Sequence, residues 1–525
     1  MLSRIATFLV KNKVFIILIF VLILFRIPSL FEPTWYGDEG VYAAVGNDIN
    51  QGKVLYSETW DNKTPLIYYT YAIVFKIFGV NLLWVKVLSL IFSIILFIYF
   101  FRIFRLLFPD KKFISAGVLF IIFWGAHFFE ANIASGENFF VPISVAATFY
   151  FLKYILRTGK NIDILIAGLL WGIAFLYKIH PLFDIIGVLL FYIVFILRPN
   201  SAADHSDEKF ITVRGVPELL SQKIMYLAKT FIIIATGFIT PALIFLIGAS
   251  ASSSLGDFLQ MFLSQSGTYV FDFKNAAFGL IFFESTLVTR TILLLIIFVV
   301  LAYLFFKHKI NVKYFLVLNM FIFSAYAVLF SGRPYPHYLL QIFIPFILLL
   351  VLVYQVKRDS FSLLKFSSIG FLILYFVLNL FYLGQRMSVY NSPIYYANFI
   401  SYAAGFQNEQ KYNDTFDSHV NPLQNLLSNT QELRGQKVFL MENLPWYYPL
   451  SGVINPSKYT ALYHLGQDRV NLNDFATTLS HNAKYIIINS KSYKDLVPSE
   501  LKKIIGESYF QYKMVGDFVV FKNFY

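Results

Sequence analysis

Long apolar runs recur through the first 384 residues of this 525-residue chain. A helix needs about 20 apolar residues to cross the ~30 Å hydrocarbon core of a bilayer. Only 14% of the residues are charged, against about 25% in soluble proteins. The apolar runs predict a multi-spanning α-helical membrane protein with eleven spans, near residues 14–31, 83–106, 113–129, 138–156, 161–179, 182–197, 226–248, 286–306, 314–331, 337–356 and 366–384.

The positions of Lys and Arg predict the side of the membrane on which each loop lies. Every second loop is basic, starting with Arg4, Lys11 and Lys13 before the first span, and short basic loops stay in the cytoplasm. We therefore expect a cytoplasmic N-terminus and an extracytoplasmic C-terminus. The membrane itself is expected to be a prokaryotic-type plasma membrane. The predicted outer loops are 32–82, 130–137, 178–181, 249–285 and 332–336.

Two segments depart from the pattern of spans. Residues 66–78 are apolar but too short to cross, so they are predicted to form an amphipathic helix at the membrane surface. From about residue 385 polar residues replace the apolar runs, and strand-like runs occur at 437–441, 485–489 and 518–521. We expect a transmembrane domain over 1–384, including the first outer loop 32–82, and a soluble extracytoplasmic α/β domain over 385–525. That domain has thirteen Lys and Arg against eleven Asp and Glu, too balanced for a nucleic-acid surface.

Two adjacent carboxylates, Asp38 and Glu39, follow the first span closely. Neighbouring residues of a helix point about 100° apart, so only one of the two can face a given site. The functional interpretation is a general base for an acceptor hydroxyl, or a ligand of a metal ion. The structural interpretation is that Asp38 caps a helix that begins at Glu39.

A lysine, Lys63, stands two residues before Pro65, at the start of the predicted surface helix. Functionally, its ammonium group would neutralise the phosphate of a lipid-linked substrate near a helix N-terminus. The alternative is an interfacial anchor that extends to the lipid headgroups.

These residues form part of an ordered motif in the first outer loop. It reads Asp38-Glu39-x-x-Tyr42, Gly52-x-x-x-Tyr56, Trp60-Asp61-x-Lys63-x-Pro65 and an aromatic helix that ends at Phe78-Gly79. The motif resembles the first extracytoplasmic loop of the family-39-like GT-C glycosyltransferases, which include protein O-mannosyltransferases and lipid A aminoarabinose transferases.

Later segments resemble the same family less specifically. Glu137, preferred here to Glu130, lies where such enzymes place a second carboxylate. Lys178 ends a Gly-rich span and is an isolated cation on the outer side, so we expect it to have an anionic partner or to reach an aqueous cavity. We expect His180 to stabilise a turn.

The late outer loop adds three candidate phosphate contacts: Arg333, His337 and Tyr338. A guanidinium binds phosphate bidentately, and the other two side chains donate hydrogen bonds. The alternative is an aromatic interface belt with one arginine extended to the headgroups. Arg290, at the start of a span, is a further candidate phosphate contact.

The resemblance implies a glycosyltransferase that moves a sugar, with inversion, from a polyprenyl-phosphate donor to a glycan, lipid or protein acceptor at the outer membrane face. Asp38 would be the catalytic base, while Lys63, Lys178 and Arg333 would stabilise the departing phosphate. With no Cys in the chain, thiolate metal sites are excluded. A carboxylate-bound Mg²⁺ or Mn²⁺ stays open, with Asp38 and Glu137 as candidate ligands.

Two other functions remain open at this stage. A transporter or flippase of lipid-linked substrate would also place polar groups among membrane spans. It would place them at mid-membrane depth and show inverted repeats, whereas the polar residues here gather in the outer loops. An inactive scaffold of the same architecture is the third possibility, and it would make Asp38 dispensable.

Overall fold

The computed structural model describes residues 13–109, 111–198, 219–268, 287–331, 335–355, 392–491, 493 and 497–524. By its contacts the chain divides into two compact units. The first, here called the helical unit, contains Met1–Ile27, Ser89–Phe245 and Ser266–Ser392. The second, here called the mixed unit, contains Pro28–Leu88, Leu246–Gln265 and Pro393–Tyr525.

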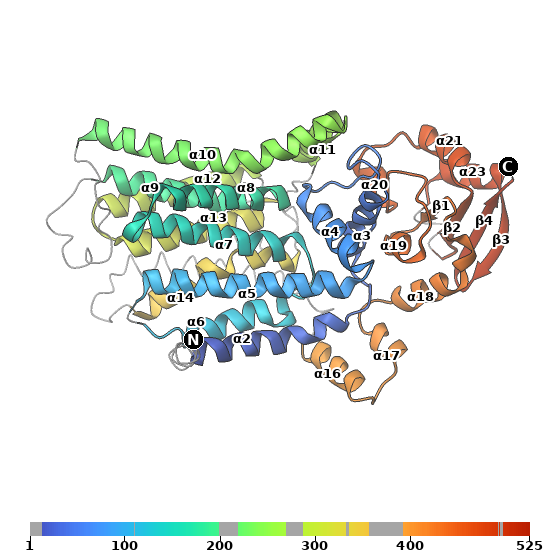
Figure 1. The fold of residues 1–525 in the computed structure, drawn as a ribbon, viewed down its shortest axis with the longest axis horizontal. Coiled ribbons are helices and arrows are strands. Elements are labelled where there is room, and N and C mark those ends of the chain that lie inside the picture. The colour runs from blue at the N-terminus through green and yellow to red at the C-terminus, as the bar shows by residue number, and fades with distance from the viewer. Residues whose placement is uncertain are drawn as a thin grey trace. The chain divides into compact units, whose positions relative to one another are not determined.

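The helical unit consists of apolar helices that run side by side (Figure 1). Two of its helices, α5 and α10, extend into the mixed unit. Its described elements are α2 (Lys13–Arg26), α5 (Leu82–Leu107), α6 (Ile114–Phe120), η2 (Ile121–Gly125), η3 (His127–Phe129), α7 (Gly136–Lys153), η4 (Tyr154–Thr158), α8 (Asn161–Tyr177), α9 (Pro181–Leu197), α10 (Leu220–Ala251), α12 (Leu287–Phe306), α13 (Val312–Phe330), η7 (Pro336–Gln341) and α14 (Phe343–Gln355). Helix α7 packs on α8, and α13 packs on α9, α12 and α14.

The multi-spanning architecture predicted from the sequence is confirmed. In the described part of the chain, five helices are long and apolar enough to cross a membrane: Lys13–Phe31, Leu82–Leu107, Gly136–Leu156, Leu220–Ala251 and Val312–Phe330. The shorter apolar helices are Leu66–Phe78, Ile114–Gly125, Asn161–Tyr177, Pro181–Leu197, Arg290–Phe306 and Phe343–Tyr354. Each predicted span up to 337–356 coincides with one of these helices, while 366–384 lies outside the described residues.

Two predicted spans differ from the structure in their limits. The span expected over 113–129 stops being regular at Gly125, after the π-helical turn Ile121–Gly125. The span expected from 337 begins as a 3-10 helix, and α14 starts only at Phe343. Pro345 explains the second difference. Inside a continuous helix it would clash with the carbonyl of Gln341, four residues earlier, so this proline is tolerated only in the first turn of a helix.

Glycines allow a close contact between two helices of the helical unit. A Cβ atom at Gly168 or Gly172 of α8 would collide with backbone atoms of α10, and one at Gly237 of α10 would collide with α8. Small residues four apart let two helices approach to backbone contact in a membrane. The Gly-rich character of the predicted 161–179 span is therefore a packing requirement.

The mixed unit has a four-stranded sheet in the order β1-β2-β4-β3. Its strands are β1 (Val438–Met441), β2 (Tyr485–Asn489), β3 (Tyr509–Val515) and β4 (Phe518–Asn523). Strands β1 and β2 pair in parallel, and the other two pairs are antiparallel. Helices α21 (Leu472–Asn482) and α23 (Ser499–Ser508) pack together beside the sheet (Figure 1). The strands expected near the C-terminus form this small mixed sheet, and the domain boundary predicted near residue 385 lies outside the described residues.

Other helices of the mixed unit come from the first loop and from the start of the C-terminal segment. They are α3 (Gly37–Asn50), α4 (Leu66–Phe78), α11 (Leu255–Thr268), α16 (Ser392–Ala403), α17 (Glu409–Asp414), α18 (Val420–Asn429), α19 (Tyr447–Ser451) and α20 (Tyr463–Gln467). The first of these, α3, packs against α4 and α19. The first polar loop and the C-terminal segment thus fold as one compact unit.

Helix α4 has the limits predicted for the surface helix. One face, including Tyr68 and Tyr71, is buried, and Gly46 of α3 admits α4 because a Cβ atom there would lie 2.9 Å from the backbone nitrogen of Ala72. The other face exposes Ile73 and Ile77. An exposed apolar face is typical of a helix that lies at a membrane interface.

Candidate functional site

The N-terminus of α3 places Asp38 on a partly exposed surface. The helix begins at Gly37, and Tyr36 is its N-cap residue, with no side-chain capping bond. The interpretation of Asp38 as a helix cap is therefore wrong. Its carboxylate Oδ2 instead lies 2.9 Å from the ammonium nitrogen of Lys63 and accepts a hydrogen bond of 3.2 Å from the Tyr42 hydroxyl.

The Asp38–Lys63 pair is accessible to solvent. The two side chains are 33% and 24% exposed, and the Lys63 ammonium also lies 4.6 Å from the centre of the Tyr42 ring. An exposed ion pair adds only about 0–1 kcal/mol to stability. The fold therefore gains little from this pair, and both groups remain within reach of a ligand.

Glu39 points the opposite way, into the interior of the mixed unit. Its side chain is fully buried, and its Oε1 lies 2.7 Å from the Lys86 ammonium nitrogen. The same ammonium lies 3.1 Å from Glu32 Oε2, while the Tyr395 hydroxyl donates to Glu32 Oε1 at 2.6 Å. Glu39, the second acid of the predicted motif, thus belongs to a buried charge cluster with Lys86 and Glu32.

The sequence reasoning missed Glu32 and Lys86. Lys86 lies near the start of a long apolar helix, where a lysine is ordinarily an interfacial anchor. The one available signal was the spacing of Glu32 and Glu39 by seven residues. Seven residues are about two turns of a helix, so the two acids would face the same way if that segment were helical.

Tyrosine side chains hold the backbone around Lys63. The Tyr56 hydroxyl donates to the Lys63 carbonyl at 2.8 Å, and the Lys63 amide donates to the Tyr68 hydroxyl at 3.2 Å. The Tyr68 hydroxyl in turn donates to Asp61 Oδ2 at 2.7 Å. Burial, followed by the negative charge of Asp61, raises the Tyr68 pKa well above its usual range, so this hydroxyl stays protonated. The position of Lys63 is therefore fixed locally.

The C-terminal segment also contacts this loop. The Trp60 amide donates to the Lys458 carbonyl at 2.8 Å, and the Asn62 side chain donates to Gln467 Oε1 at 3.1 Å. His464 is fully buried, and its ring nitrogen Nε2 lies 3.5 Å from Asp61 Oδ1. Burial lowers the His464 pKa to about 4 in spite of the nearby Asp61, so the ring is neutral at neutral pH. Residues 458–467 thus help to shape the loop that carries Lys63.

A second polar cluster lies in the helical unit. Glu137, in the first turn of α7, forms an ion pair with Lys178, which follows α8. The Lys178 ammonium lies 3.8 Å from the centre of the Tyr338 ring. His337 Nδ1 lies 2.7 Å from Glu130 Oε2. The anionic partner expected for Lys178 is therefore Glu137.

Two further residues singled out in the sequence, Arg290 and His180, are buried within the fold. Arg290 is buried and donates to the carbonyls of Leu329 and Phe330 at the end of α13, where it caps that helix. The His180 ring is buried beside Tyr338, with 5.5 Å between ring centres. Arg333 lies outside the described residues.

The predicted site residues therefore fall into two clusters. Asp38 and Lys63 meet in the mixed unit, with Glu39 directed into its interior. The second cluster gathers Glu137, Lys178, His337 and Tyr338 in the helical unit. Among the described residues, no group of three or more His, Cys, Asp or Glu side chains is arranged to hold a metal ion.

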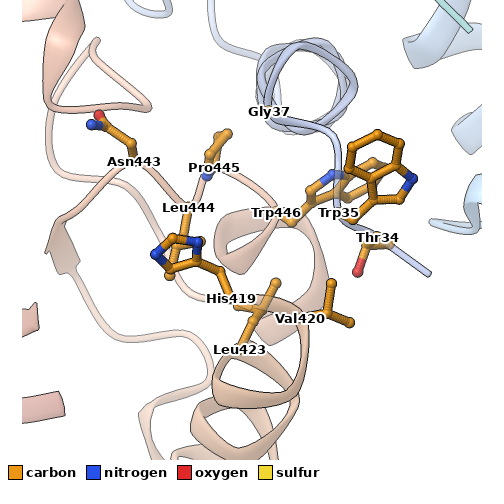
Figure 2. Close-up of a pocket in the computed structure, with 10 residues that line it drawn as sticks. All are labelled: Thr34, Trp35, Gly37, His419, Val420, Leu423, Asn443, Leu444, Pro445 and Trp446. Atoms are coloured by element: carbon orange, nitrogen blue, oxygen red, sulfur yellow. The ribbon is translucent and has the colours of Figure 1, made fainter. Parts of the chain in front are cut away.

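A small pocket lies beside the residue that precedes Asp38. Its lining includes Trp35 and Gly37 from the first loop and His419, Asn443 and Trp446 from the C-terminal segment (Figure 2). Figure 2 shows the two tryptophans at one end of the group and Asn443 at the other. The volume is about 20 Å³, little more than the space that one water molecule needs. Trp446 donates to the Tyr36 carbonyl at 3.1 Å, so this region is a packed contact that supports the start of α3.

Comparison with known proteins agrees with the resemblance seen in the sequence. Residues 62–204 match the family model described as dolichyl-phosphate-mannose-protein mannosyltransferase. No curated protein matches the chain significantly. The resemblance to GT-C glycosyltransferases is confirmed, and it rests on this match and on the fold.

Two solved structures share the fold over nearly the whole chain. ArnT from Cupriavidus metallidurans in the apo state is 11% identical, covers 96% of this chain and 97% of its own, and superposes with a TM-score of 0.55. The same protein bound to undecaprenyl phosphate is 12% identical, covers 98% of both chains and has a TM-score of 0.52. The chain therefore has an ArnT-like fold with a small C-terminal mixed sheet.

Proposed function

We infer that this chain, which matches a mannosyltransferase family model over residues 62–204 and has an ArnT-like fold, is a glycosyltransferase that takes a sugar from a polyprenyl-phosphate donor. The observation that carries this inference is the partly exposed Asp38–Lys63 pair, with 2.9 Å between Oδ2 and Nζ. It places a carboxylate base beside a cation in the motif that resembles the family. The undecaprenyl phosphate bound to the ArnT structure supports a donor of that lipid class.

In the proposed reaction the oxygen of an acceptor hydroxyl attacks the anomeric carbon of the sugar. Asp38 removes the proton of this hydroxyl during the attack. The new bond joins that oxygen to the anomeric carbon, and the bond from the carbon to the phosphate oxygen breaks. The lipid phosphate leaves with the bonding electron pair, and the configuration inverts. General base catalysis of this kind contributes about 10²–10⁴-fold in rate.

Lys63 has the charge and donors to stabilise the leaving phosphate. An ammonium group has three N–H donors, so a bond to Asp38 leaves others for phosphate oxygens. A cation aimed at charge that develops in the transition state lowers the barrier directly. The clamped backbone of Lys63 reduces the reorganisation that this step would need.

The cluster in the helical unit supplies further candidate donor contacts. Lys178, His337 and Tyr338 carry the cation and the N–H or O–H groups that bind phosphate, and Glu137 holds Lys178 in place. Arg333 retains its proposed role as a bidentate phosphate contact. We propose that the acceptor is glycosylated at the extracytoplasmic face, with the N-terminus in the cytoplasm.

The test is transfer or hydrolysis of a synthetic short-chain polyprenyl-phosphate sugar by the purified full-length protein. Asp38→Asn keeps the shape of the side chain but removes the base, so turnover should fall about 10²–10⁴-fold. Asp517→Asn is the matched control, because Asp517 also forms an exposed ion pair with a lysine, Lys491, at 2.7 Å. Near-normal turnover by Asp38→Asn would overturn the assignment, and a wild-type protein inert toward every such donor would favour the inactive scaffold.

A further inference from the structure

A polar groove in the mixed unit lies next to the segment that leads to Lys63. Its volume is about 640 Å³, within the ~300–1,000 Å³ typical of ligand sites. One wall comes from the first loop, with Lys53, Ser57 and Glu58. The other comes from residues 455–459 and from one face of α21.

The α21 face is suited to contact a ligand. Asn471, Asp474 and Thr478 line the groove and are exposed. Their spacing along the helix brings them to one side of it. Phe475 lies on the same side and lines the groove as well. The face therefore offers amide, carboxylate, hydroxyl and aromatic groups together.

The two lysines of the groove already have carboxylate partners. The Lys53 ammonium lies 3.0 Å from Asp48 and donates to the Asn455 carbonyl at 3.1 Å. The Lys458 ammonium lies 3.0 Å from Asp468. An anionic ligand would have to compete with these carboxylates for the lysines. Glu58 and Asp474 add two further carboxylates to the lining, so the groove disfavours an anionic ligand, and its polar groups suit a neutral ligand that forms many hydrogen bonds.

We propose that this groove binds a neutral oligosaccharide. This oligosaccharide is the acceptor of the proposed transfer, or the part of the acceptor that the protein recognises. The hydroxyl and amide groups of the lining match sugar hydroxyls, which both donate and accept, and the half-buried Phe475 offers aromatic surface to a sugar ring. None of the described lining residues lies in a strand of the sheet. The groove therefore presents no strand edge to which an extended peptide could add as a further strand.

The groove is connected to the candidate site through the backbone. Its wall residue Tyr459 pairs with Trp60 in an isolated bridge, and Trp60 stands three residues before Lys63. Glu58, on the opposite wall, accepts a 2.8 Å hydrogen bond from the Val54 amide, which fixes the first-loop side. An occupant would therefore lie against the same loop that carries the proposed phosphate-binding lysine.

This inference rests on the proposed function for its biological role, but binding is measured separately. The full-length protein in lipid nanodiscs is titrated with neutral gluco- and manno-oligosaccharides of two to six units, and binding is followed by saturation-transfer NMR. Thr478→Arg puts a large side chain into the groove and should abolish binding. Asp474→Ala removes a hydrogen-bonding carboxylate and should weaken binding about tenfold or more. Thr477→Arg, an exposed neighbour on α21 that does not line the groove, is the matched control and should bind as the wild type does.

The outcomes separate the two proposals. Oligosaccharide binding that Thr478→Arg removes, together with transfer that Asp38→Asn removes, supports both. If binding is normal but no donor is ever turned over, the proposed function fails and the groove stands. Absence of binding by the wild type, equal binding by Thr478→Arg, or selective binding of peptides or anionic lipids would overturn the groove assignment.

Discussion

The ammonium nitrogen of Lys63 lies 2.9 Å from the carboxylate of Asp38, which joins the first turn of α3 to the loop that precedes α4. Its neighbour Glu39 meets a different lysine, Lys86, at 2.7 Å inside the mixed unit. Two adjacent acids therefore have separate partners. The partly exposed pair is available to a ligand, whereas the buried pair positions the helix that presents it.

Replacing Lys63 should weaken use of the donor without unfolding the protein. Lys63→Ala removes one charge-assisted phosphate contact, a loss of about 1.5–3 kcal/mol, which corresponds to roughly 10–100-fold in kcat/KM. Steady-state kinetics with a synthetic polyprenyl-phosphate sugar measures this loss. Lys491→Ala, which removes the exposed partner of Asp517, is the control, and equal activity of both variants would refute the role of Lys63.

Replacing Lys86 should destabilise the fold. Lys86→Met leaves the buried carboxylates of Glu32 and Glu39 without their shared cation, and breaking a buried ion pair costs about 3–5 kcal/mol. Thermal unfolding of the full-length protein should show a clearly lower midpoint. Combining Lys86→Met with Glu39→Gln should restore part of the loss. Asp38→Asn should change the midpoint little, because an exposed pair contributes about 0–1 kcal/mol.

His464 should make the mixed unit sensitive to acid. Its pKa in the folded state is about 4, below the ~6.5 of an unfolded chain, so the unfolded state binds more protons between these values. Stability is therefore complete above about pH 6.5 and falls as the pH is lowered toward about 4, by up to about 3 kcal/mol. Unfolding midpoints of wild type and His464→Gln at several pH values measure this. An identical pH dependence in both proteins would contradict it.

The orientation of the chain is testable with reporter fusions. The alternating basic loops predict that residue 110 faces the cytoplasm and residue 400 the outside. Alkaline phosphatase should be active only when fused after residue 400, and green fluorescent protein only when fused after residue 110. The same result at both positions would rule out the predicted topology.

Local patterns were enough to predict most helices and part of the sheet. The limits of α4 and the strands near 438–441, 485–489 and 518–523 agree with the runs seen in the sequence. Strand β3 was missed because most of its residues are exposed at the sheet edge. The available signal was Gly516-Asp517, which links β3 to β4 as a two-residue turn of a type that joins strands into hairpins.

The sequence by itself determined the membrane-spanning architecture, since a bilayer requires about 20 consecutive apolar residues per helix and that requirement is local. It also indicated Asp38 and Lys63 as candidates, through a short ordered motif. Only the tertiary structure decided which charge meets which: Glu39 with Lys86, Glu137 with Lys178, and Asp61 beside His464. These partners are far apart in the chain. Their pairing depends on how helices and loops pack, because a buried charge is tolerated only where packing supplies a counter-charge or a hydrogen bond.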